Sequence, residues 1–180
     1  MKTKDMIEKL IKKNRIFKGK ILDLFCDDVE LPNGELATRE YLQNSGATTV
    51  LPFLDRENIV LVKQFRYPLN QITYELPAGK MDKDETPLAC VIRELQEETG
   101  YKAKRLEELL SFYPTTAFST EIIHLFAAFG LKEGVPNPDK DEFVSKEILS
   151  FKDAVKMVRT GEIKDSKTII ALLYFENILK

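Results

Sequence analysis

The chain has 180 residues, of which 43% are hydrophobic and 31% are charged, and its 27 basic and 29 acidic residues give a net charge of −2. This composition is typical of a globular protein with a sizeable core and excludes a disordered chain. The small net charge creates no field that would attract nucleic acid or an anionic membrane, so neither is expected as a partner. No apolar segment has the length of a membrane helix or the form of a signal peptide, so we expect a cytoplasmic protein.

Residues 1–45 are expected to form a subdomain of their own. An apolar stripe at helical spacing predicts a short amphipathic helix over residues 4–13. Two extended segments are predicted next, at 17–30 and 35–42. Pro32-Asn33-Gly34 lies between them and predicts a hairpin turn.

Residues 46–180 are expected to form a mixed sheet flanked by helices, which is an α/β fold. Runs rich in Val, Ile, Leu and Phe predict its strands, at 48–54, 58–65, 73–76, 105–112, 121–128 and 142–145. The clearest helix is predicted over 87–99, because Thr86 suits the N-cap and Gly100 suits the position just past the end. Two further helices are predicted at 151–160 and 166–179.

The helix predicted at 87–99 carries an apolar stripe and, beside it, an acidic face. The stripe is expected to pack on the sheet and consists of Leu88, Val91, Ile92 and Leu95. Glu94, Glu97 and Glu98 share the acidic face at spacing i, i+3, i+4. Like charges at this spacing destabilise a helix by about 0.2–0.5 kcal/mol per pair, whereas a divalent cation reverses that cost. An acidic face that is exposed to solvent and binds no metal would show the same pattern. The surrounding residues must therefore distinguish between these two interpretations.

The surrounding residues match a known motif. The segment reads Gly79-x5-Glu85-x7-Arg93-Glu94-Leu95-x-Glu97-Glu98-x-Gly100-Tyr101. It resembles the Nudix box, G-x5-E-x7-R-E-U-x-E-E-x-G-U, where U is a bulky aliphatic residue. A chance match to the fixed Gly, Glu and Arg positions is on the order of one in a million. Tyr101 departs from the aliphatic residue usual in the family, and we interpret it as a packing change.

This resemblance implies a fold, an activity and a set of roles. The implied fold is a Nudix-type α/β/α sandwich with a mixed sheet and an N-terminal antiparallel β subdomain. The implied metal ion is Mg²⁺, with Mn²⁺ as the alternative, and its implied ligands are the carbonyl of Ala78 and the carboxylates of Glu94, Glu97 and Glu98. Arg93 and Glu85 match a pair that orients the helix carboxylates, and Gly79 lets the loop approach them closely.

The resemblance extends to the ADP-ribose pyrophosphatase subgroup. Glu75-Leu76-Pro77-Ala78-Gly79 is similar to its E-L-P-A-G lead-in, and residues 62–67 resemble its V-x-Q-x-R-Y strand. These matches imply substrate-binding roles for Glu75 and for Arg66, whose forked guanidinium suits phosphate. Arg39, in Thr38-Arg39-Glu40, matches a second arginine of this kind. Phe17 matches a segment that stacks on adenine in some relatives, although core packing would explain it as well.

Two later segments also fit the subgroup. Asp141-Glu142-Phe143-Val144 is similar to its D-E-F-[IV] segment, which makes Glu142 a candidate metal ligand or general base beside the catalytic candidates Glu97, Glu98 and Arg93. An ordinary charged loop is the alternative. Residues 161–168 fit its G-x-I-x-D-x-K-T segment, which we interpret as structural. The N-terminal strands cross to a partner subunit in some relatives, which implies a homodimer with shared sites.

The predicted function is Mg²⁺-dependent hydrolysis of the pyrophosphate bond of ADP-ribose or a related nucleoside diphosphate sugar, which gives AMP and ribose 5-phosphate from ADP-ribose. One departure weakens the substrate assignment, because Thr116 stands where the subgroup usually has proline. Two alternatives therefore stay open. One is a Nudix hydrolase of another nucleotide, such as a nucleoside triphosphate, a dinucleotide or a flavin nucleotide, and the other is a non-catalytic nucleotide sensor.

Overall fold

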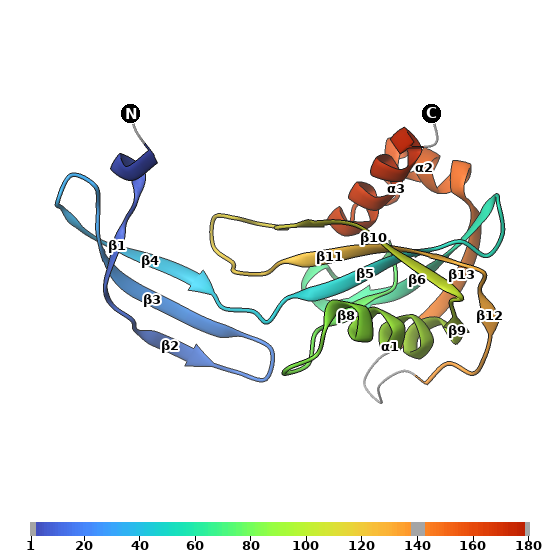
Figure 1. Ribbon diagram of the computed structural model, residues 1–180, viewed down its shortest axis with the longest axis horizontal. Helices are drawn as coiled ribbons and strands as arrows, with labels where there is room; N and C mark the ends of the chain where they lie inside the picture. The colour runs from blue at the N-terminus through green and yellow to red at the C-terminus, as the bar shows by residue number, and fades with distance from the viewer. Residues whose placement is uncertain (1–2, 138–142, 179–180) are drawn as a thin grey trace. The chain divides into compact units, whose positions relative to one another are not determined.

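The computed structural model describes residues 3–137 and 143–178, which form two compact units (Figure 1). The first unit consists of residues 1–45 and 115–121, and the second of 46–114 and 122–180. No helix in these described parts of the chain is both long enough and apolar enough to cross a membrane.

The first unit is an antiparallel sheet. Its strands are β1 (Lys9–Lys12), β2 (Arg15–Lys18), β3 (Asp23–Glu30) and β4 (Leu36–Leu42). Strand β3 pairs antiparallel with the other three, and its inward residues include the buried Phe25 and Val29. The predicted turn between β3 and β4 is confirmed, since the amide of Leu31 donates to the carbonyl of Glu35 at 2.8 Å and Gly34 has φ +87°.

The helix predicted over residues 4–13 is wrong. The chain forms one turn of 3-10 helix, η1 (Thr3–Met6), and then strand β1, in which Lys9 lies opposite Glu30 of β3. Alternating charged and apolar residues suit either structure. Pairing with β3, which is distant in the sequence, decides in favour of the strand.

The second unit contains two larger sheets and a short strand pair. The order β10-β11-β5-β8 makes a mixed sheet, because β11 and β5 are parallel and the other neighbours antiparallel. The order β13-β6-β7 makes an antiparallel sheet, and β12 pairs with β9. The strands are β5 (Ala47–Pro52), β6 (Asn58–Arg66), β7 (Gln71–Glu75), β8 (Ala78–Lys80), β9 (Tyr101–Lys102), β10 (Arg105–Phe112), β11 (Ile123–Phe129), β12 (Lys132–Glu133) and β13 (Val144–Ser150), with a 3-10 turn, η2 (Tyr67–Leu69), between β6 and β7.

Helices cover the sheets of the second unit on two sides. Figure 1 shows α1 (Pro87–Thr99) on one side, and α2 (Phe151–Thr160) and α3 (Ser166–Ile178) on the other. Side chains of successive strand residues alternate between two cores. The core under α1 contains Val50, Val60, Val91 and Leu95. The core under α2 and α3 contains Leu51, Leu61, Ala154 and Leu172. The predicted α/β/α sandwich with a mixed sheet and an N-terminal antiparallel β subdomain is confirmed.

Three details differ from the prediction. The apolar stripe of α1 faces the sheet only in part, because Leu88 and Ile92 are half-exposed while Glu94 and Glu98 are buried. Strand β13 extends to Ser150, well beyond the segment predicted at 142–145. The short strands β8, β9 and β12 have no signal in the sequence, because two or three residues cannot show a period.

Candidate functional site

Helix α1 places the carboxylates of the box. It begins as the sequence predicts, because the Thr86 hydroxyl accepts a hydrogen bond from the amide of Ala89 at 3.2 Å, and it ends at Gly100, which has φ +77°. Two of the box glutamates are buried, with only 8% of Glu94 and 7% of Glu98 exposed. Burying a carboxylate is costly unless it is hydrogen-bonded or paired with a cation, so the groups around these two residues matter.

Arg93 binds three carboxylates at once. It makes a two-bond fork to Glu85, with Nε donating at 3.1 Å and Nη2 at 3.0 Å. Its Nη1 donates to Glu94 Oε1 at 2.6 Å and to Glu97 Oε2 at 2.9 Å. The Nη2 group also donates to the carbonyl of Lys80 at 3.1 Å. The guanidinium therefore holds the acidic face of α1 against the segment that precedes the helix.

The electrostatics of this network favour its charged form. The hydrogen bonds from Arg93 lower the pKa of Glu85 to about 2, and the carboxylates, Glu85 first, raise the pKa of the guanidinium. Arg93 and Glu85 are therefore both ionised at neutral pH. Three negative groups share one positive group in these contacts, which is the arrangement in which an added cation is stabilising.

The strand β8 supplies the other wall of the site. The amide of Ala78 donates to Glu98 Oε2 at 3.0 Å. A Cβ atom on Gly79 would overlap the Glu94 carboxylate, so only glycine permits this approach. The Ala78–Gly79 backbone and the two buried glutamates therefore form one close-packed unit.

The residues fit a hard divalent cation by their chemistry. Carboxylate and carbonyl oxygens are the donors that Mg²⁺ and Mn²⁺ prefer, and Glu94, Glu97, Glu98 and the Ala78 carbonyl provide them. Within the described parts of the chain, no three acidic, His or Cys side chains are already grouped as a metal site, and Arg93 supplies the positive charge beside Glu94 and Glu97. Glu142 lies outside the described residues.

A second charged cluster lies on strands β6 and β7. Arg66 makes a fork to Glu75, with Nε donating to Oε1 at 2.7 Å and Nη2 to Oε2 at 2.6 Å. Lys167 of α3 also pairs with Glu75, which is 2% exposed. Burial alone would raise the pKa of Glu75, but the bonds from Arg66 and the charge of Lys167 outweigh it and lower this pKa to about 2. Of the substrate-binding candidates, Arg66 and Glu75 are thus brought together.

The remaining candidates lie in the first unit. Arg39 on β4 pairs with Glu8 and donates to the carbonyl of Thr38 at 2.9 Å. Phe17 on β2 is 54% exposed, so the alternative that it packs in the core of its own chain is wrong. Thr116 lies on the exposed segment of this unit formed by 115–121.

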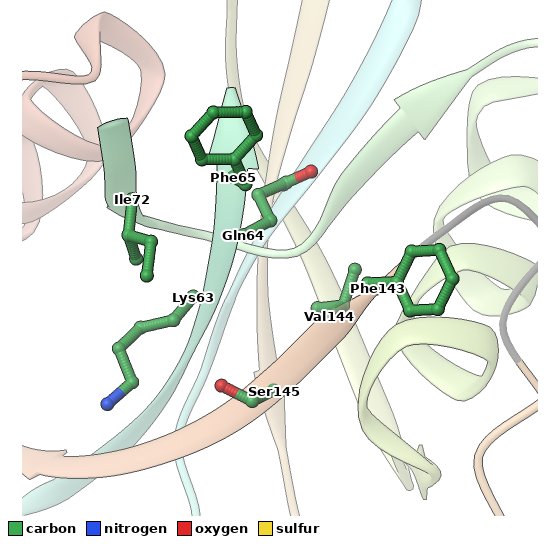
Figure 2. A pocket seen from close by; sticks show the side chains of 7 residues that line it. All are labelled: Lys63, Gln64, Phe65, Ile72, Phe143, Val144 and Ser145. Atoms are coloured by element: carbon green, nitrogen blue, oxygen red, sulfur yellow. The ribbon is translucent and has the colours of Figure 1, made fainter. Parts of the chain in front are cut away.

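A pocket of about 490 Å³ lies on the antiparallel sheet of the second unit. Figure 2 shows side chains from three strands and from the residue before β13 around it. The lining residues are Lys63, Gln64, Phe65, Ile72, Phe143, Val144 and Ser145. None of them belongs to the box, and no pattern in the sequence groups them, because β13 meets β6 only in the folded chain.

The sequence also missed the role of Lys167, which was placed in a structural segment. Lys167 lies in the first turn of α3, where the helix dipole disfavours a cation, and this position is the signal that could have indicated an acidic partner. Cys90 is fully buried, and burial raises its pKa to about 11. His124 Nδ1 shares a hydrogen bond with the Ser111 hydroxyl at 2.8 Å.

Comparison with known proteins identifies the family. The family model of the NUDIX domain matches residues 44–173, and that of the nucleoside diphosphate sugar hydrolase N-terminal domain matches residues 8–42. This chain belongs to the Nudix hydrolase family. Nudix hydrolases generally use divalent metal ions, in agreement with the donor set on α1 and β8.

Several proteins resemble this Nudix hydrolase over nearly its whole length. An ADP-ribose pyrophosphatase of Bacillus subtilis is 44% identical, with 96% of this chain and 95% of the relative covered. A methanol dehydrogenase activator of Bacillus methanolicus is 43% identical, with 94% and 92% covered. A crystal structure of an ADP compounds hydrolase superposes with a TM-score of 0.86 at 16% identity, covering 96% of this chain and 94% of that one, which supports the fold.

Proposed function

We propose that this Nudix hydrolase cleaves the pyrophosphate bond of ADP-ribose or a related nucleoside diphosphate sugar with Mg²⁺, and that ADP-ribose gives AMP and ribose 5-phosphate. The observation that carries the proposal is the close packing of the buried Glu94 and Glu98 against Ala78 and Gly79. The 44% identity to a relative named ADP-ribose pyrophosphatase supports the substrate class.

The box residues have distinct tasks in this proposal. Glu94, Glu97, Glu98 and the Ala78 carbonyl hold the metal, joined by Glu142 from outside the described residues. Bound divalent ions neutralise the diphosphate and make water a better nucleophile. Glu97, Glu98 or Glu142 takes the proton of the attacking water on a carboxylate oxygen. Arg93 keeps Glu94 and Glu97 in position through its bonds to these two carboxylates and to Glu85.

Substrate recognition is assigned to cations and one aromatic ring. The side chain of Arg66 is 44% exposed while its guanidinium fork is held by Glu75, so it presents an oriented positive charge to a phosphate. Arg39 is a second phosphate contact and Phe17 a stacking platform for adenine in this proposal. Both are exposed in the first unit and therefore accessible to a ligand.

A different nucleotide substrate is the second candidate. Thr116 replaces the proline usual in the ADP-ribose subgroup, and a 43% identical relative carries the name of a methanol dehydrogenase activator. The third candidate, a sensor without catalysis, would have no need for the full set of box carboxylates.

The deciding experiment is a product analysis with and without Mg²⁺. Purified protein is incubated with ADP-ribose, ADP-glucose, NADH, FAD and nucleoside triphosphates, and the products are separated by chromatography. We expect AMP and ribose 5-phosphate from ADP-ribose at the highest kcat/KM, and no turnover in EDTA. Faster turnover of another nucleotide would select the second candidate, and no turnover of any substrate would select the sensor.

We also propose a cytoplasmic homodimer in which residues 1–45 provide the dimerisation subdomain. Strands β1 and β2 are exposed along their whole length, including the apolar side chains of Leu10, Ile11 and Ile16, and exposed apolar surface of this kind favours association. Both cysteines are free, as is usual in a reducing compartment. Light scattering should give the mass of two 20.7 kDa chains.

A further inference from the structure

Lys167 is a buried cation between two acids. Only 8% of the residue is exposed, and its ammonium group pairs with Glu75 and, at 3.0 Å, with Asp165 Oδ1. It belongs to the segment at 161–168 that the sequence assigned only to structure. A lysine without such partners would be costly to bury, so its position depends on Glu75 and Asp165.

The local fold fixes where this lysine points. The hydroxyl of Thr168 accepts a hydrogen bond from the amide of Leu76 at 2.8 Å and donates to Asp165 Oδ2 at 2.6 Å. Asp165 Oδ2 also accepts from the amide of Thr168 at 3.0 Å. These bonds join the start of α3 to the residue that follows Glu75, so Lys167 is held beside the Glu75 carboxylate.

Glu75 in turn determines the orientation of Arg66. Oε1 accepts from Arg66 Nε and from Thr73 Oγ1, each at 2.7 Å, and Oε2 accepts from Arg66 Nη2 at 2.6 Å and from Lys167. These four bonds restrain the carboxylate, and the planar fork then restrains the plane of the guanidinium. If Lys167 is removed, the carboxylate loses one of its two cationic partners and keeps the bonds from Arg66 and Thr73, so its orientation is less tightly fixed.

We propose that Lys167 is a positioning residue for substrate binding, which acts by locking Glu75 so that the Arg66 guanidinium is aligned for a substrate phosphate. This inference rests on the proposed function. In this role Lys167 does not contact the substrate. Its effect passes through Arg66 and requires the fork.

The test is a double-mutant cycle between Lys167→Met and Arg66→Lys. Arg66→Lys keeps a cation beside Glu75 but removes the fork. Dissociation constants are measured by calorimetry for α,β-methylene ADP-ribose, which cannot be hydrolysed, and KM and kcat are measured for ADP-ribose. We expect Lys167→Met to raise Kd and KM about tenfold with kcat changed less than about twofold, which is the size of one lost charge-assisted hydrogen bond. In the Arg66→Lys background, Lys167→Met should raise Kd less than about twofold.

Two controls separate positioning from stability. Arg159→Met removes another cation that pairs with α3, at Glu176, and should change Kd less than about twofold because this pair is exposed. The Arg66 Nε–H resonance, assigned by its loss in Arg66→Lys, should be sharp and slowly exchanging in the parent and broadened in Lys167→Met. If Lys167→Met does not fold, Lys167→Gln takes its place in the same cycle.

The outcomes are distinct. An unchanged Kd in Lys167→Met, or an equal rise in both backgrounds, would overturn the positioning role even if the parent hydrolyses ADP-ribose. A parent that neither binds the analogue nor turns over ADP-ribose would overturn the proposed function. The Arg66 resonance still tests the positioning in that case, because it needs no substrate, and an unaltered resonance in Lys167→Met overturns it.

Discussion

The second unit contains two charged clusters that differ in their balance of charge. In the box cluster, Arg93 binds Glu85, Glu94 and Glu97, so three carboxylates contact one guanidinium. In the Glu75 cluster, two cations meet two acids, because Arg66 and Lys167 face Glu75 and Asp165. The two clusters therefore differ in the ratio of acidic to cationic groups in contact, more than in how deeply these groups are buried.

This difference indicates what each cluster can do. A group of carboxylates with one shared cation is stabilised by a further cation, which makes the box cluster suited to divalent metal. A balanced group needs no further ion and is suited to holding one side chain in a fixed orientation. We therefore expect changes in the first cluster to affect metal-dependent turnover, and changes in the second to affect substrate affinity and acid stability.

The largest effect is expected from Glu98→Gln, which keeps the shape of the side chain and removes its charge. As a metal ligand it should lower kcat with ADP-ribose by at least about 100-fold, since even partners outside the ligand shell typically contribute 10–100-fold. Circular dichroism should show an unchanged fold. Turnover at the parent rate would show that Glu98 holds no metal.

Gly79→Ala tests the close approach of β8 to α1. The added Cβ would overlap the Glu94 carboxylate, so the glutamate must move. We expect kcat to fall about tenfold or more and the free energy of unfolding to fall by about 1–3 kcal/mol. Gly161→Ala is the matched control, because Gly161 has φ +78° but open space around its Cβ position. It should lose about 1–2 kcal/mol of stability through backbone strain and retain kcat.

Arg66→Lys tests the balanced cluster through affinity. Lysine keeps the charge and loses the fork that Glu75 holds, so KM for ADP-ribose should rise about tenfold while kcat changes little. Steady-state kinetics measure this directly. A fall in kcat with unchanged KM would place Arg66 in the chemical step and remove the contrast between the clusters.

The smallest effect concerns acid stability. The pKa of Glu75 is about 2 in the fold against its ordinary 4.5, so the ionised carboxylate stabilises the fold above pH 4.5, and this stabilisation is lost as the pH falls toward 2. Urea unfolding should show that Glu75 lowers the free energy of unfolding by about 2 kcal/mol as the pH falls from about 5 to about 3. Glu75→Gln should lack this loss, whereas Glu133→Gln, at a 75% exposed side chain, should retain it. Equal acid sensitivity in Glu75→Gln and the parent would contradict the assignment.

The sequence predicted the elements that are determined locally. Helix α1 has the predicted bounds because Thr86 and Gly100 cap it with bonds inside the helix. The N-terminal strand β1 was predicted as a helix because its partner β3 lies elsewhere in the chain. Strand pairing of this kind leaves no local signal in a segment of four residues.

The same distinction applies to the candidate site. The spacing within the box placed Glu94, Glu97 and Glu98 on one face of α1, and the helix does so. The spacing also predicted that Leu88 and Ile92 would face the sheet, but both are half-exposed. Glu94 is buried instead, on the side of α1 that faces β8, where Gly79 leaves room for its carboxylate. The contact between Lys167 and Glu75 joins residues 92 positions apart, so only the folded chain reveals it.

The central claim is that the acidic face of α1 binds divalent ions for diphosphate cleavage, and the most direct measurement is the rate of AMP release from ADP-ribose as Mg²⁺ is titrated into metal-free protein. We predict no release in EDTA, a saturable rise with Mg²⁺ and equimolar ribose 5-phosphate. An equal rate in EDTA and in saturating Mg²⁺ would contradict the claim.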